Sequence, residues 1–166
     1  MTARGIDLVY GGGRVGLMGI LADAVLERGG HVIGVIPDAL VALEVAHLKL
    51  PDLRVVGSMH ERKAMMASLA DAFIAMPGGF GTFEELFEAL TWTQLGLHAK
   101  RCGLLNVGGF YDPLLALLER SENEGFLKPA NRRLLEAAAG PEALLDALAV
   151  PLPPAEGKWI RSAEET

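Results

Sequence analysis

Short apolar runs alternate with longer amphipathic stretches along most of this chain. Runs of strand length stand at residues 6–10, 31–36, 72–76 and 102–106. Apolar positions with helical spacing occupy residues 16–28, 113–124 and 141–149. This alternation is typical of parallel strands connected by helices. We therefore predict an α/β fold, a Rossmann-like parallel sheet with helices on both faces.

Local signals refine some of these boundaries. Gly29 and Gly30 end the first helix, and Asp112 is expected to cap the helix that has Pro113 at its first position. Residues 53–57 predict a further short strand, whose place in the sheet the sequence does not assign.

The composition limits the classes of protein that the chain can be. A length of 166 residues with 51% hydrophobic residues predicts one domain, residues 1–150, followed by an extended proline-rich tail, residues 151–166, in which Trp159 and Ile160 could contact the body. The net charge of −6 argues against a nucleic-acid partner. Without an apolar segment of the roughly 20 residues that span a bilayer, and with Cys102 as the only cysteine, we expect a cytoplasmic protein that does not contact membranes.

Residues 77–85, PGGFGTFEE, join an apolar strand to an amphipathic helix. Gly78, Gly79 and Gly81 allow an anion to approach the backbone, and the helix that follows offers free N–H groups. Glu84 and Glu85 add carboxylates, which suggests chemistry beside a phosphate site. Residues 11–19, GGGRVGLMG, repeat the strand, glycine turn and helix, but no acid follows at the position that NAD binding requires. Close packing of helix on sheet is the competing explanation for these first glycines.

Arg62 lies on the apolar side of a predicted helix. Ser58 and Glu61 match a capping box, so this helix begins near Met59 and runs to about Leu69 or Ala70. Met59, Met66, Leu69 and Ala70 form the apolar arc that contains Arg62. A guanidinium there needs an anionic partner, either an internal carboxylate or a phosphate, and the glycine loop favours the phosphate. Lys63 could add a second positive contact, or be solvated.

Glu85 has a competing structural explanation. Thr82 and Glu85 also fit a capping box, in which Glu85 would only bond the N-cap amide. On the same helix Glu85, Ala89 and Trp92 form a second face, which a partner subunit or a ligand pocket could cover.

Five segments together closely resemble the LONELY GUY (LOG) family of cytokinin riboside 5′-monophosphate phosphoribohydrolases, whose members are often labelled lysine decarboxylases. These segments are VYGGGRVGLMG, GVIP, SMHERKAMM, MPGGFGTFEELFEALTWTQLG and LLNVGGFYDPLL. The motif PGGxGTxxE is the family hallmark and is complete at residues 77–85. The resemblance runs from about Gly5 to the tail.

The resemblance implies cleavage of the N-glycosidic bond of an adenosine-type nucleoside 5′-monophosphate, without a cofactor or metal, by a homodimer. It makes Arg62 and Glu85 the catalytic pair. The residues implied to line the nucleotide site are Glu44, Arg62, Lys63, Gly79, Phe80, Gly81, Thr82, Phe83, Glu84, Glu85 and Thr91. Cytokinin riboside monophosphate and plain AMP both remain open as substrates.

The family's first strand and helix are missing from this sequence. The strand would lie between those at residues 6–10 and 72–76, and its loss would leave unpaired backbone groups on both flanks. We expect either a chain that starts late or a slot that another segment fills. Direct hydrogen bonding between the two flanking strands would refute this expectation.

Two other functions compete with the hydrolase. A related fold could carry a nucleotide-bearing cofactor, such as the molybdenum cofactor, without cleaving it. A lysine decarboxylase would need a Schiff-base lysine, but the available lysines show no pattern for pyridoxal phosphate: Lys49, Lys63, Lys100, Lys128 and Lys158. The four histidines, His31, His47, His60 and His98, show no paired metal-ligand spacing.

Overall fold

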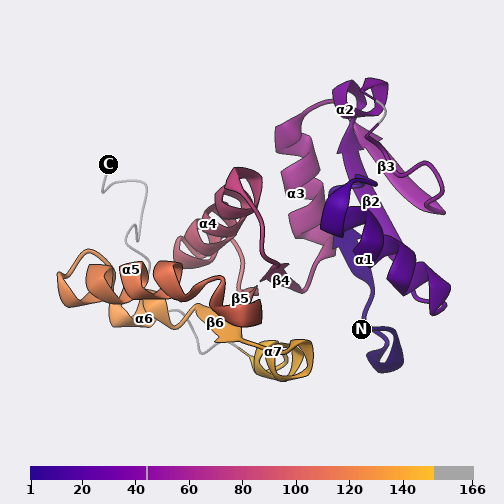
Figure 1. The fold of residues 1–166 in the computed structure, drawn as a ribbon. Helices are drawn as coiled ribbons and strands as arrows, with labels where there is room; N and C mark the ends of the chain where they lie inside the picture. The colour runs from indigo at the N-terminus through magenta and orange to yellow at the C-terminus, as the bar shows by residue number, and fades with distance from the viewer. Residues whose placement is uncertain (44, 152–166) are drawn as a thin grey trace. The chain divides into compact units, whose positions relative to one another are not determined.

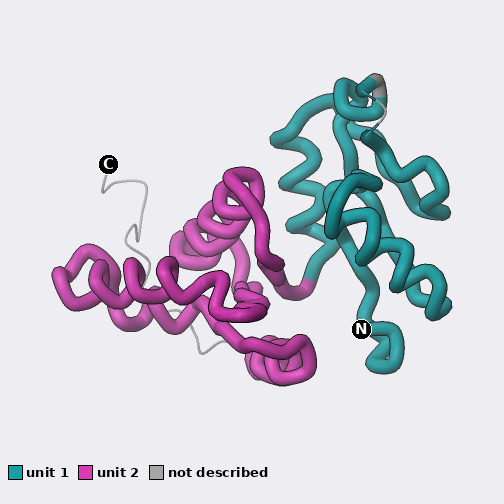
Figure 2. Tube along the Cα trace, viewed as in Figure 1, with its two compact units in different colours: residues 1–70 teal, residues 71–166 magenta. Residues whose placement is uncertain are grey.

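The structure is a computed structural model that describes residues 1–43 and 45–151. The chain divides into two compact units, residues 1–70 and residues 71–166 (Figure 2), and each is described by itself. Glu44 and the predicted tail beyond residue 151, with Trp159 and Ile160, lie outside the described residues. The single domain expected over residues 1–150 stays a prediction.

Unit 1, residues 1–70, is a parallel sheet of three strands with helices packed on both faces (Figure 1). Its elements are a 3-10 turn (Thr2–Arg4), β1 (Leu8–Tyr10), α1 (Gly16–Glu27), β2 (Val32–Pro37), α2 (Asp38–Ala42), β3 (Asp52–Val56) and α3 (Met59–Leu69). The strand order is β1-β2-β3, and the central strand β2 is buried along its whole length. Val32 packs with α1 and its neighbour Ile33 with α3, because successive side chains of a strand point to opposite faces.

Unit 2, residues 71–166, contains a second three-stranded parallel sheet in the order β4-β5-β6. Its elements are β4 (Ala72–Ala75), α4 (Phe80–Gln94), β5 (Arg101–Leu105), a 3-10 turn (Val107–Gly109), α5 (Asp112–Asn123), α6 (Pro129–Arg132), β6 (Leu135–Ala138) and α7 (Pro141–Leu148). Leu86 and Ala89 of α4 join the buried core with Cys102 and Leu104 of β5. Leu144 of α7 lies so close to Gly103 that a methyl group there would be 2.9 Å from its Cδ1 atom.

The predicted α/β fold of parallel strands alternating with helices is confirmed. All four predicted strands are present, and residues 53–57 supply β3, which pairs in parallel with β2. β6 is a strand that the sequence analysis did not predict. The predicted helices over residues 16–28, 113–124 and 141–149 correspond to α1, α5 and α7.

The predicted cap at Asp112 is wrong. Asp112 is itself the first residue of α5, and Tyr111 occupies the N-cap position without a side-chain cap bond. The Asp112 carboxylate instead accepts a hydrogen bond from Nδ2 of Asn106 at 2.8 Å. Asn106, on the preceding loop, therefore binds the carboxylate that the sequence pattern predicted to bind the free amides of the helix.

β1 and β4 each stand at one end of their own sheet. Among residues 1–43 and 45–151 no strand pairing joins them, so the hydrogen bonding that would refute a missing strand is not observed. The missing strand stays a prediction. In these same residues, no helix combines the length and the apolar character needed to cross a membrane.

Candidate functional site

The first glycine turn, Gly11–Gly13, links β1 to α1 at the carboxyl end of the sheet in unit 1. Each of these glycines lies against another part of the unit. A methyl group on Gly11 would overlap the guanidinium of Arg62, and one on Gly12 would be 3.1 Å from the Cβ atom of Ile36. The close approach of Arg62 and of β2 thus accounts for the absence of side chains at Gly11 and Gly12, and it puts Arg62 directly on the turn. Close packing of helix on sheet, the competing explanation for these glycines, stays a prediction.

Arg62 and Lys63 reach this position because of how α3 begins. The Oγ atom of Ser58 accepts from the Glu61 amide at 3.1 Å, as the capping box predicts. The Glu61 carboxylate bonds the Gly57 amide at 2.7 Å, one residue before the N-cap. Arg62 and Lys63 are both half-buried on the second half of this first turn. The structure therefore brings two predicted cationic residues to the carboxyl end of the sheet in unit 1.

A buried histidine also supports the first glycine turn. The side chain of His47 is 6% exposed, and its Nε2 atom lies 3.0 Å from Oδ1 of Asp23 on α1. The backbone N–H of His47 donates to the Gly12 carbonyl at 2.8 Å, and the N–H of Arg14 donates to Val45 at 2.9 Å. Residues 45–47 are thereby attached to the turn on two sides.

Tyr10, the last residue of β1, has a buried hydroxyl without a hydrogen-bond partner among the described residues. Burial, together with the negative charge of Asp23, raises the pKa of Tyr10 to about 12. Its hydroxyl therefore stays protonated at neutral pH.

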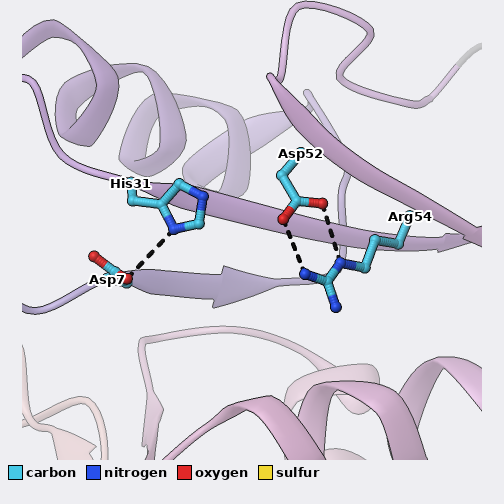
Figure 3. A network of polar contacts seen from close by, with 4 residues as sticks. All are labelled: Asp7, His31, Asp52 and Arg54. Atoms are coloured by element: carbon cyan, nitrogen blue, oxygen red, sulfur yellow. Dashed lines mark hydrogen bonds and ion pairs between the residues drawn. The ribbon is translucent and has the colours of Figure 1, made fainter.

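The opposite end of this sheet holds a separate polar network (Figure 3). His31 and Asp7 pair at 3.3 Å just before β2 and β1, and Arg54 donates two hydrogen bonds of 3.0 Å to Asp52. The Arg54 bonds lower the pKa of the Asp52 carboxyl. Because ligands of parallel α/β sheets bind beyond the carboxyl ends of the strands, this network lies away from the candidate site.

The second glycine loop connects β4 to α4 in unit 2. Gly79 is the N-cap and Phe80 the first residue of α4, and no side chain caps this end. The capping box predicted from Thr82 and Glu85 is therefore wrong, since Thr82 is already the third helical residue. Its side chain packs against Gly78, where a methyl group would overlap the hydroxyl. Glu85 is the sixth residue of α4 and lies beyond its N-cap.

The predicted residues of this loop differ in exposure. Gly79, Phe80, Gly81 and Glu84 are exposed, whereas Thr82, Phe83 and Glu85 are half-buried. Thr91, two turns further along α4, is exposed and donates from Oγ1 to the Phe87 carbonyl at 2.7 Å. Gly79 to Glu85 thus lie together in unit 2, Arg62 and Lys63 lie together in unit 1, and Glu44 is outside the described residues.

The face of α4 that bears Trp92 is covered in part within unit 2. Ala89 belongs to the buried core, and the Trp92 ring meets the His98 ring edge-on with centroids 6.2 Å apart. A partner or a ligand is therefore not needed to cover Ala89, whereas for Glu85 and Trp92, which are half-buried, such a cover stays a prediction. Burial lowers the pKa of His98, with a smaller effect from Lys100.

Tyr111 and the pair formed by Asp23 and His47 are not among the residues predicted from the sequence. Tyr111 is 1% exposed, and its hydroxyl donates to the Met76 carbonyl at 2.6 Å, directly before Pro77. No spacing rule connects residues that are 24 or 35 positions apart. The local feature that marks Tyr111 in the sequence is its place directly before Asp112 and Pro113, where a helix begins.

Comparisons with known proteins match most of the chain to one family model and to several curated proteins. A family model described as "Possible lysine decarboxylase" matches residues 18–148. The chain is 53% identical over 154 residues to "Probable cytokinin riboside 5′-monophosphate phosphoribohydrolase LOGL5" of Oryza sativa subsp. japonica, covering 93% of this chain and 63% of that protein. It is 55% identical over 138 residues to "Cytokinin riboside 5′-monophosphate phosphoribohydrolase LOG" of the same plant, covering 83% and 57%. It is 50% identical over 148 residues to the Arabidopsis thaliana protein "Cytokinin riboside 5′-monophosphate phosphoribohydrolase LOG2", covering 89% and 70%.

The chain belongs to the LOG family. It spans between 57% and 70% of the length of these three relatives. The LOG hallmark PGGFGTFEE forms the loop and the first turns of α4, and the segment SMHERKAMM forms the capped start of α3. The family-model description refers to lysine decarboxylation, whereas these three relatives are named as phosphoribohydrolases.

Proposed function

We propose that this protein hydrolyses the N-glycosidic bond of adenosine-type nucleoside 5′-monophosphates and releases the free base and ribose 5-phosphate. The observation that carries the proposal is the 50–55% identity, over most of the chain, to proteins named for this activity. The open, uncapped start of α4 with Glu85 beside it supports the same chemistry. Cytokinin riboside monophosphate and AMP are the two proposed substrates.

In the proposed reaction, water adds to C1′ of the ribose, the bond from C1′ to the base nitrogen breaks, and a proton from water ends on the base. Such cleavage passes through an oxocarbenium-like state, as in glycoside hydrolysis. The Glu85 carboxylate would stabilise that positive charge or activate the water. Arg62 would hold the anionic substrate or assist the leaving base.

The phosphate would bind at the glycine loop, where the first amides of α4 have no intrahelical partner. Lys63, Glu44 and Thr91 would complete the nucleotide site. No cofactor or metal enters this scheme.

The deciding experiment compares Glu85→Gln with the unchanged chain, using AMP and a prenylated AMP and detecting free base. Removing the charge while keeping the shape should leave nucleotide binding nearly intact and lower turnover at least ~100-fold, the lower range for a positioned acid or base. Glu119→Gln, an exposed glutamate of α5, is the matched control and should retain full turnover.

Three outcomes would count against the proposal in different ways. A Glu85→Gln variant that keeps most of its rate would remove Glu85 from the mechanism. Tight nucleotide binding without any product from the unchanged chain would favour the carrier function. Absence of both binding and product would overturn the proposed function for this chain.

We further propose a homodimer in the cytoplasm. Phe80, Phe87 and Leu95 on or next to α4 expose between 40% and 93% of their surface, and so large an apolar area is typical of an interface. The cytoplasm is a reducing compartment, in keeping with the free cysteine Cys102. Sedimentation at the mass of one chain would contradict the dimer.

A further inference from the structure

Tyr111 contacts the entrance of the glycine loop in unit 2. Its hydroxyl donates to the Met76 carbonyl at 2.6 Å, and Met76 stands between the end of β4 and Pro77. The residue is 1% exposed. The bond is partly buried, so the loss of its donor would carry a cost, and it holds the backbone where the loop leaves the strand.

The same side chain contacts the exit of the loop. The rings of Tyr111 and Phe83 meet edge-on, with centroids 6.4 Å apart. Phe83 lies in the first turn of α4, and its amide donates to the Gly79 carbonyl at 3.1 Å. Met76 and Phe83 enclose residues 77–82, so one buried side chain holds both ends of the glycine loop.

Tyr111 is itself fixed from the other side by Asn106. The Asn106 Oδ1 atom accepts from the Tyr111 amide at 2.7 Å, and its Nδ2 group donates to Asp112 at 2.8 Å. The Asn106 amide donates to Ala138, the last residue of β6. Burial raises the pKa of Tyr111, which keeps its hydroxyl a donor. The chain of contacts runs from the sheet through Asn106 and Tyr111 to the loop.

We infer that Tyr111 is the positioning residue of the glycine loop, setting its backbone amides for the 5′-phosphate of the nucleotide. This inference rests on the proposed function. Tyr111 has no contact with substrate in this scheme and acts through residues 77–82. Its effect should therefore depend on the phosphate of the ligand, whereas a purely structural role would weaken all ligands alike.

The test measures the affinities of AMP and of adenosine for Glu85→Gln with and without Tyr111→Phe, well below the unfolding midpoints, because the Glu85→Gln change prevents the consumption of AMP. The Tyr111→Phe change keeps the ring contact with Phe83 and removes only the hydroxyl. The AMP affinity should fall about tenfold, the effect expected for one lost hydrogen bond, while the adenosine affinity should change less than about twofold.

Ser121→Ala is the control. The Ser121 hydroxyl also donates to a backbone carbonyl, that of Leu117 at 2.9 Å, but this bond lies within α5. Its removal should leave both affinities unchanged. If Tyr111→Phe fails to fold, Asn106→Ala provides the second variant, and it should show the same selective loss of AMP affinity in smaller size.

Hydrogen exchange of the amides of residues 78–83 separates this inference from the proposed function. Tyr111→Phe should speed their exchange even if the unchanged chain binds no AMP, in which case only the proposed function fails. Equal losses of AMP and adenosine affinity would show a structural role and overturn the inference. Unchanged AMP affinity together with unchanged exchange would overturn it as well.

Discussion

At the scale of single residues, glycines of the two turns leave space for neighbouring side chains of the protein as well as for a ligand. The Gly11 position is filled by the guanidinium of Arg62, and the Gly78 position by the hydroxyl of Thr82. In both cases the residue that needs the space is one that the LOG resemblance places in or beside the nucleotide site. The absence of a side chain on the turn therefore determines where that polar group can lie.

Gly11→Ala should test this relation for Arg62. The added methyl group would overlap the guanidinium and displace it from the turn, so kcat/KM for AMP should fall at least about tenfold, the effect of losing one charged transition-state contact. The measurement is initial rate against AMP concentration. Gly140→Ala is the control, because its φ is −120° and nothing lies within 4 Å of the added methyl group. Full activity in Gly11→Ala would show that Arg62 need not lie on the turn.

Arg62 was predictable from the sequence, but its contact with Gly11 was not. The helical spacing put Arg62 on the side of α3 that carries Met66 and Leu69, which pack on the sheet, and its guanidinium lies against the turn after β1. The SxxE pattern correctly started the helix. The contact with Gly11 joins positions 51 residues apart in the chain, which no local pattern encodes. Tyr111 and His47 were missed for the same reason, since each acts on backbone that lies far away in the sequence.

At the scale of elements, the chain offers two histidine–aspartate pairs in contrasting positions. Asp23 and His47 pair at the glycine turn of unit 1, where the histidine side chain is 6% exposed. Asp7 and His31 pair at the other end of the same sheet, where the histidine side chain is 51% exposed. In each pair the histidine and the aspartate are 24 positions apart in the sequence, so the two pairs differ chiefly in the burial of the histidine.

His47→Gln should lower the free energy of unfolding by about 1–3 kcal/mol, because a buried hydrogen-bonded ring that orders residues 45–47 is lost. His31→Gln should change it by no more than ~0.5 kcal/mol, as is usual for exposed pairs. Urea unfolding at neutral pH measures both. Similar losses in the two variants would show that burial does not distinguish the pairs.

The start of a helix was predictable where the capping residues bond only to backbone groups of the same turn. Ser58 and Glu61 bond inside their own turn, and their cap is confirmed. The same pattern at Thr82 and Glu85 predicted a false start, because Thr82 packs on Gly78 in a helix that had begun at Phe80. β6 is short, and its sequence LEAA does not predict a strand, because the strand forms through tertiary pairing with β5.

At the scale of the whole molecule, the proposed function assigns residues of each unit a role in nucleotide binding. Arg62 and Lys63 belong to unit 1, while Gly79 to Glu85 and Thr91 belong to unit 2. A unit that contacts the nucleotide should be stabilised by it, and a unit that does not should be unchanged.

Hydrogen exchange with bound AMP distinguishes these cases, and the Glu85→Gln variant should be used so that AMP is not consumed during labelling. At about 100 times its Kd, a ligand stabilises the state that binds it by ~2.7 kcal/mol, which slows exchange through the opened state about 100-fold. We expect slower exchange in two places, the amides around Gly11 with the first turn of α3 and the amides of residues 78–83. Adenosine at the same occupancy is the control for the phosphate.

Slower hydrogen exchange confined to residues 78–83 would support binding at the glycine loop beside Glu85 and would show that Arg62 does not contact the nucleotide. Slowing confined to α3 and the first glycine turn would reverse that assignment and make the Arg62 contact on Gly11 the phosphate site. Either result would break the catalytic pair that the LOG resemblance implies. Slower exchange in both places, with the Arg62→Ala change removing only the slowing in unit 1, would support a contact of AMP with each unit through the residues named.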